Sequence, residues 1–139
     1  MSYVPPVFEL SVIGVFDAGI PHKERIVLRP TQAVDLSHFA LIIGIQSETG
    51  VVPLNDFFRW LGPATIGPPS WLVIYTDSGA DVTTTHEQTG EPVHIKHWGK
   101  AHTLFIDSPM QIVLGVIKIG GLVSWLAPKP ATPTPLLKQ

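Results

Sequence analysis

Turn-forming residues interrupt this chain at short, regular intervals, and that spacing is the feature that most limits its fold. Twelve glycines and fourteen prolines separate short runs rich in β-branched and aromatic residues, among them 25–29, 40–45 and 71–76. Strands need only roughly four to eight such residues, whereas an amphipathic helix needs a longer apolar stripe. No convincing stripe of that kind is present. The pattern predicts an all-β domain of about seven to eight short strands, either a β-sandwich or a closed barrel.

The size and composition of the chain indicate one core followed by a tail. Of its 139 residues, 45% are hydrophobic and 14% are charged, a balance opposite to that of disordered chains. We expect a single β-sandwich domain over residues 1–127. The prolines at positions 128, 130, 133 and 135 favour an extended polyproline conformation. Residues 128–139 are therefore predicted to be a tail that packs as a strap or reaches a neighbouring subunit.

Alternating and continuous apolar runs place the expected strands. In 7–16 the even positions Phe8, Leu10, Val12 and Phe16 are apolar, which predicts one inward face. Residues 40–45 predict a central strand buried on both faces, after a turn at 35–38, and 71–76 is the clearest strand. Further strands are expected at 25–29, 93–98, 103–106 and 111–119, with a hairpin or an exposed loop at 83–90.

Two segments are harder to assign. Residues 51–61 fit either a short helix capped by Asn55 or Asp56 or a strand, and the sequence leaves both open. Residues 110–127 are apolar enough to suggest a membrane span. However, they contain Lys118, a Gly120-Gly121 pair and many β-branched residues. Two strands around a glycine turn are expected there.

Charge and cysteine content exclude several classes of function. The formal net charge is −2 and the nine Lys and Arg residues are scattered from Lys23 to Lys138, so nucleic-acid binding is not expected. The chain has no cysteine, which excludes disulfides and thiolate chemistry. The first residues lack the basic region of a signal peptide, and no membrane association is expected. The expected location is the cytoplasm.

Three histidines lie close together in the sequence and form the first candidate site. His94, His97 and His102, with His86 or Asp107, offer ligands for a divalent metal in a metal-binding protein or metal-assisted enzyme. Positions 94 and 97 point to opposite faces of a regular strand, which argues against a shared ion. The alternative interpretation places His94 and Lys96 on the solvent face of an edge strand and makes His97 a hydrogen-bonded core residue.

Other motifs for chemistry are weak. Ser78 follows a strand in Thr-Asp-Ser-Gly, but this is not the Gly-x-Ser-x-Gly elbow of hydrolases and indicates a turn. The glycines at 115, 120 and 121 fit neither the Rossmann nor the Walker spacing. No catalytic residue and no cofactor is predicted.

Four tryptophans raise the possibility of a small-molecule or glycan site. Exposed indoles can stack on sugars and cations, but tryptophans in a domain of this size more often anchor the core. Trp71 and Trp98 are expected in the core or at its rim, and Trp60 is the better surface candidate. The binding hypothesis uses Trp60 and Trp98, with His97 as a further candidate contact.

The order of three short segments resembles that of lamin-tail-like domains. They are Val34-Asp-Leu-Ser-His-Phe-Ala-Leu41, Trp71-Leu-Val-Ile-Tyr-Thr-Asp-Ser-Gly79 and Trp98-Gly99, and they correspond to a corner, a strand ending in a glycine turn and a Trp-Gly before the last hairpin. The resemblance covers about residues 25–119 and implies an immunoglobulin-like antiparallel β-sandwich. It also implies a non-catalytic module, so no functional residue carries over. The Pro-Pro-Ser before Trp71, residues 7–16 and the tail depart from the family pattern.

The preferred hypothesis is a non-enzymatic protein-interaction or structural module that binds a protein partner or itself. An exposed sheet edge, or the loops at one end of the sandwich, would form the contact. This expectation depends on the absence of any sequence motif that assembles a nucleophile with its base, a metal site or a phosphate cradle. The metal-binding and small-molecule hypotheses remain as alternatives.

Overall fold

The structure is a computed structural model that describes residues 6–48, 50–105 and 112–129. Within these ranges the chain forms ten strands and one short 3₁₀ turn, η1. The elements in chain order are β1 (Leu10–Phe16), β2 (Arg25–Pro30), β3 (Val34–Asp35), η1 (Leu36–His38), β4 (Phe39–Ser47), β5 (Gly50–Trp60), β6 (Thr65–Ile66), β7 (Trp71–Tyr75), β8 (Val82–Thr85), β9 (Pro92–His97) and β10 (Ile112–Lys118).

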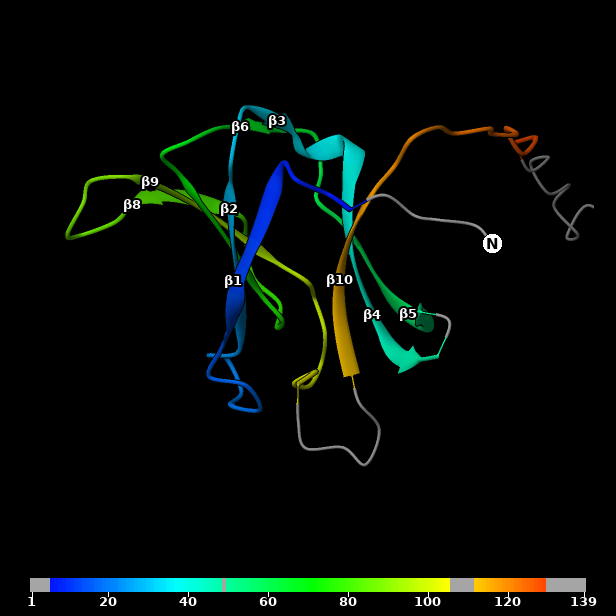
Figure 1. Ribbon diagram of the computed structural model, residues 1–139, viewed down its shortest axis with the longest axis horizontal. Coiled ribbons are helices and arrows are strands. Elements are labelled where there is room, and N and C mark those ends of the chain that lie inside the picture. The colour runs from blue at the N-terminus through cyan, green and yellow to red at the C-terminus, as the bar shows by residue number, and fades with distance from the viewer. Residues whose placement is uncertain (1–5, 49, 106–111, 130–139) are drawn as a thin grey trace, which may run out of the picture.

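Two sheets pack against each other, and Figure 1 shows them as the two halves of the molecule. One sheet has the order β1-β2-β7-β9-β8, the other has the order β10-β4-β5, and β3 pairs with β6 at one end. The predicted all-β sandwich is therefore confirmed. The parallel pairing of β7 with β9 departs from the expected antiparallel sandwich, whereas the other pairs in both sheets are antiparallel. It arises because β8 runs back along the far edge and β9 then inserts between β7 and β8.

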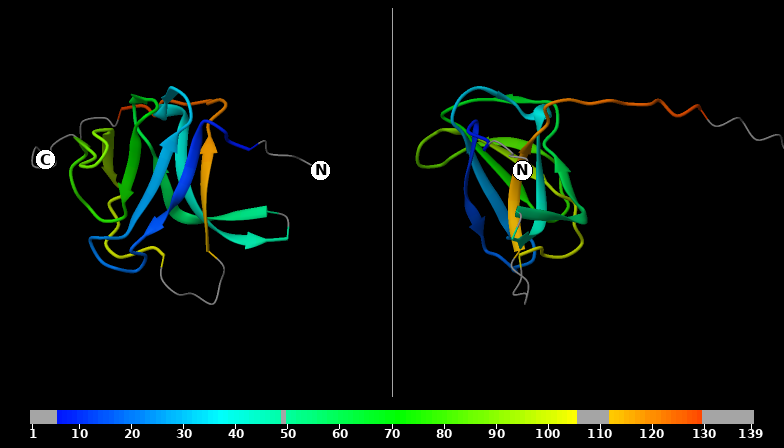
Figure 2. Two further views of the ribbon diagram at one scale, coloured as in Figure 1. Left: turned by 60° about the vertical axis from the view of Figure 1, so that its left-hand side comes forward. Right: turned by 45° about the vertical axis from the view of Figure 1, so that its right-hand side comes forward.

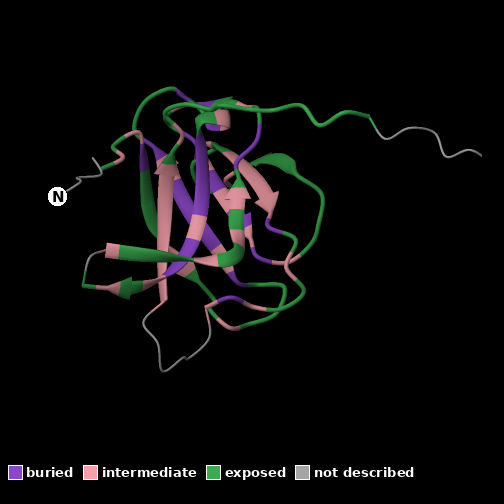
Figure 3. Cartoon of the chain, turned by 90° about the vertical axis from the view of Figure 1, so that its right-hand side faces the viewer, coloured by how far each residue is buried: buried purple, intermediate pink, exposed green. Residues whose placement is uncertain are grey.

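The core lies between the inward-facing rows of the two sheets. Alternate residues of β2 and β7 face β4, and the side chains of Leu28, Leu72 and Leu41 are fully buried. Trp98 and Leu104 close the core beyond the end of β9, with 9% and 6% of their surface exposed. Burying one such large apolar side chain stabilises the fold by roughly 1.5–3 kcal/mol. Figure 3 shows this buried layer running through the middle of the sandwich.

A β-bulge changes the predicted orientation of β1. The register with β2 shifts between Val12 and Gly14, which leaves Ile13 as the extra residue. Because side chains alternate with a period of two, one extra residue exchanges the inward and outward positions. Val12 faces inward before the bulge, but Val15 rather than Phe16 faces the core after it. The prediction that Phe16 shares the inward face of Val12 is therefore wrong.

The structure assigns the segment that the sequence left open, and it lacks one expected strand over the described residues. Residues 51–60 belong to β5, which answers the question left open between helix and strand, although residues 54–57 bulge out of its pairing with β4. The strand expected at 103–106 does not form over 103–105, which lie in a loop, and Ile106 is outside the described residues.

Within the described residues 112–127, the second strand of the glycine hairpin expected over 110–127 does not form. β10 ends at Lys118, and residues 119–129 have no regular secondary structure. The amide of Ile119 donates to the His38 carbonyl at 2.7 Å and continues the β10–β4 pairing by one residue. The chain therefore leaves the sandwich before the glycine pair and well before residue 128. Residues 130–139, which hold most of the predicted tail, are outside the described residues.

The expected solvent face of β9 is the inward face. β9 is not an edge strand, since it lies between β7 and β8, and its register places His94 opposite Leu72 and Lys96 opposite Ile74. The Lys96 side chain is only 15% exposed, and its Nζ lies 3.6 Å from Asp81 Oδ2. The pattern of polar residues misleads because this face of β9 borders a cavity of about 190 Å³, whose lining also includes Leu36 and Ile66.

Candidate interaction site

The three sequence-adjacent histidines have separate surroundings. His94 Nδ1 lies 3.3 Å from the Thr83 hydroxyl on β8, and His94 also lines a cavity with Lys96. His97 contacts Asp77, and His102 lies exposed in the loop after β9. In the described part of the chain, no group of three or more His, Asp or Glu residues is arranged to hold a metal ion. Asp107, the further ligand considered, is outside the described residues.

Asp77 joins two histidines at one end of the five-stranded sheet. Its two carboxylate oxygens lie 3.0 Å from His22 Nδ1 and 3.1 Å from His97 Nδ1. The contact with His22, and to a smaller extent that with His97, holds the pKa of Asp77 below its usual range. The His97 ring also stacks on Tyr75, and a Cβ at Gly79 would lie 2.5 Å from that ring. This packing fixes the His97 ring at the end of β9.

A buried carboxylate that no sequence motif indicated stabilises the same end. Glu24 is 1% exposed and accepts from the amides of Gly19, Leu104 and Phe105 and from the Thr76 hydroxyl, at 2.6–3.0 Å. Burial alone would raise its pKa, but these hydrogen bonds more than offset that and hold the pKa below its usual range. We refer to these five residues as the Glu24 clamp, which joins three chain segments.

Of the tryptophans in the binding hypothesis, one is on the surface and one is in the core. Trp60 is 42% exposed at the end of β5, and its Nε1 donates to the Ser37 carbonyl at 2.8 Å. Trp98 is 9% exposed and packs in the core cluster. The two indoles are therefore not presented on one surface.

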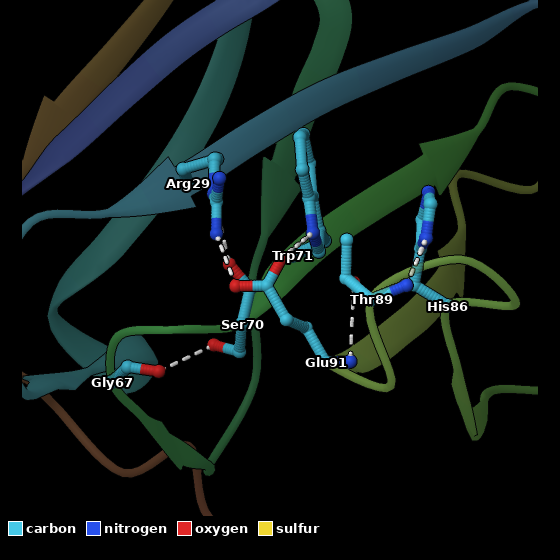
Figure 4. A network of polar contacts seen from close by, with 7 residues as sticks. All are labelled: Arg29, Gly67, Ser70, Trp71, His86, Thr89 and Glu91. Atoms are coloured by element: carbon cyan, nitrogen blue, oxygen red, sulfur yellow. Dashed lines mark hydrogen bonds and ion pairs between the residues drawn. The ribbon is translucent and has the colours of Figure 1, made fainter.

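Trp71 lies in the polar network drawn in Figure 4. The Arg29 guanidinium lies 3.9 Å from the centre of the indole, and the His86 ring stacks at 6.0 Å. The Glu91 carboxylate accepts hydrogen bonds from both Arg29 and Trp71 Nε1. Neighbouring apolar residues, including Val73, form a groove of about 360 Å³ on the outer face of the sheet. Trp71 therefore already has stacking partners. The same network holds the loop at 86–91 against the sheet.

β1 and β10 are edge strands on one side of the sandwich. Within the described residues, β1 pairs only with β2, and β10 pairs only with β4. Figure 1 shows them facing each other without pairing. At one end Lys118 Nζ donates to Glu9 Oε2 at 2.6 Å, and this hydrogen bond is the main cause of the lowered pKa of Glu9. Unpaired edges present backbone N–H and C=O groups to any added strand.

The inward side chains of these two strands are incompletely covered. Val12 lies opposite the fully buried Leu28, yet it is 45% exposed. On β10, Leu114 and Val116 lie opposite buried residues of β4, yet they are only partly buried. We call this open side the seam, and its lining residues are Val12, Val15, Ile112, Leu114 and Val116. Among the described residues, no strand covers this stretch of core.

A cavity of about 620 Å³ lies at the end of the seam near the ion pair. Its wall on the β1 side includes Val7, Phe8 and Glu9, and Phe8 is 73% exposed. Its wall on the β10 side includes Val116 and Lys118. This volume is within the range of cavities that hold small ligands, roughly 300–1,000 Å³, and is large enough for side chains of a bound segment.

Residues 119–129, which we call the arm, continue from β10 into solvent. Four large apolar side chains within five positions are almost fully exposed: Leu122 (86%), Val123 (100%), Trp125 (79%) and Leu126 (93%). Figure 2 shows the arm leading away from both sheets, and Figure 3 shows it exposed beyond its first residue. Clustered exposed apolar side chains of this kind mark interaction sites.

Comparison with known proteins gives no match to the chain among family models, curated proteins or solved structures. The described residues contain no helix of sufficient length and hydrophobicity to cross a membrane.

Proposed function

We propose that this protein is a non-enzymatic module that associates with other copies of itself through the seam. The observation that carries the proposal is the partial exposure of Val12, Leu114 and Val116 on the inward faces of two unpaired edge strands. Covering apolar surface contributes about 25 cal/mol per Å², and an added strand also pairs with backbone groups at the edge. Association through the seam therefore combines both kinds of interaction.

The immunoglobulin-like topology and the lamin-tail resemblance belong to the same proposal. Both agree with an interaction module built on a β-sandwich. Neither assigns a partner, and the choice of a second copy follows from the seam and the arm of this chain.

The substitution Val12→Asp tests the proposed surface. A carboxylate at this position would face apolar side chains, and we expect self-association to weaken by about a hundredfold or more because burial of an unpaired charge is strongly unfavourable. Sedimentation of wild type and variant over a wide range of protein concentrations measures the effect. Val82→Asp on β8 is the matched control, since Val82 is 52% exposed on the opposite edge of the same sheet.

The expected result is association of wild type and Val82→Asp but not of Val12→Asp. A wild-type protein that stays monomeric throughout, or a Val12→Asp variant that associates like wild type, would contradict the proposal.

A further inference from the structure

We infer that the seam of one copy binds the arm of a second copy as an added strand. This inference rests on the proposed function and names its partner segment. The strand would lie between β1 and β10, with backbone hydrogen bonds to the free edges and with side chains directed into the open core. Such strand addition obtains affinity from the main chain and specificity from alternate side chains.

The arm has the composition that the seam requires. Between Lys118 and Lys129 it carries no charged residue. Residues 122–126 in extended form span about 17 Å, the length of an ordinary strand. In an extended segment Leu122 and Leu126 lie on one face and Val123 and Trp125 on the other. Either face of the arm can therefore cover apolar side chains of the seam.

The ion pair between Glu9 and Lys118 favours a second copy over the arm's own seam. It joins the residue before β1 to the last residue of β10, at the end from which the arm departs. An arm that turned back at Gly120 and Gly121 would enter the seam at this end and would have to displace the 2.6 Å contact. The arm of another copy can approach along the rest of the seam. Residues 120–128, fully extended, span about 30 Å, roughly the diameter of a small domain.

The seam is also a better acceptor than the groove beside Trp71. The groove lies on the outer face of paired strands, so a bound segment would find no free backbone groups there. Trp71 is already stacked by Arg29 and His86. The seam offers free strand edges, partly exposed core side chains and the cavity of about 620 Å³ together.

A complementation experiment with two full-length variants tests this exchange. The seam variant is Val12→Asp, which keeps an intact arm. The arm variant combines Leu122→Asp, Trp125→Asp and Leu126→Asp, which change only exposed positions and leave the seam intact. We expect each variant alone to sediment as a monomer. We expect an equimolar mixture to form a complex of one copy of each, because one supplies the arm and the other supplies the seam.

The outcomes separate this inference from the proposed function. If the arm variant associates like wild type while the seam variant does not, the seam binds something other than the arm, and only the inference fails. If the mixture stays monomeric, the inference also fails. If the seam variant still associates, both fail. A monomeric wild-type protein whose Trp125 is shielded from a fluorescence quencher would show that the arm closes its own seam, which overturns both. Formation of the mixed complex itself shows that both variants are folded.

Discussion

The Glu24 clamp and the seam belong to one sandwich, yet they differ in how completely their inward side chains are buried. At the clamp a carboxylate is 1% exposed and both oxygens accept hydrogen bonds. At the seam Val12 needs only apolar cover, and it remains 45% exposed. The costly polar burial is thus complete, and the simple apolar burial is not. This difference indicates that, within the described residues, the sandwich is closed at the clamp and open at the seam.

The largest effect is expected from Glu24→Ala. The substitution leaves the amides of Gly19, Leu104 and Phe105 without their acceptor, and each unsatisfied buried donor costs about 1–3 kcal/mol. We expect the free energy of unfolding to fall by at least about 3 kcal/mol. Urea denaturation of wild type and variant measures it. A loss below about 1 kcal/mol would show that water replaces the carboxylate and that this end is open.

Truncation of two facing side chains sharpens the comparison between closed and open core. Leu28→Ala removes a fully buried side chain, and we expect a loss of about 2–5 kcal/mol. Val12→Ala, opposite it on β1, should cost less than about 1 kcal/mol in the monomer because half of the side chain is already exposed. Equal losses in dilute protein would contradict the description of the seam as open.

Sequence reasoning found the central strands of the sandwich but missed details of both the seam and the clamp. Residues 25–29, 40–45 and 71–76 were predicted as strands because each is a short apolar run between turn residues, and β2, β4 and β7 confirm them. The bulge at Ile13 was not predictable, since an extra residue in a strand leaves no mark in the apolar pattern. That bulge changes which residues of β1 face the seam.

The acceptor of the clamp was missed for a similar reason. In the sequence, Glu24 resembles any polar residue that precedes a strand. Its partners Leu104 and Phe105 lie about eighty residues further along the chain. Such a contact depends on tertiary structure alone. The exposed arm was mistaken for the second strand of a hairpin because its apolar residues suit a strand. If the arm pairs with a second copy, that local preference is satisfied between chains.

A smaller effect is expected from Glu24→Gln, which keeps the shape and removes the charge. The pKa of Glu24 is lower in the folded protein than its ordinary 4.5. Its charge therefore stabilises the fold fully above pH 4.5, and this contribution is lost as the pH falls through the folded pKa. We expect the variant to lose about 1–3 kcal/mol at neutral pH. Urea denaturation along a pH series should show the two proteins converging in acid. A difference that stays constant into acid would mean that the carboxylate is not held ionised.

The smallest effect concerns His94, which borders the cavity on the inward face of β9. Partial burial, and then the charge of Lys96, lower its pKa below the ordinary 6.5. The unfolded chain therefore binds this proton more readily than the folded one. His94 thus makes the free energy of unfolding fall as the pH falls below 6.5. In His94→Gln that part of the pH dependence disappears. The melting temperature of wild type should therefore fall slightly more than that of the variant between neutral and mildly acidic pH.

His38→Gln is the control, because His38 is exposed. If the melting temperatures of wild type and His94→Gln depend on pH identically, His94 is solvated. This part of β9 would then be open, as the seam is.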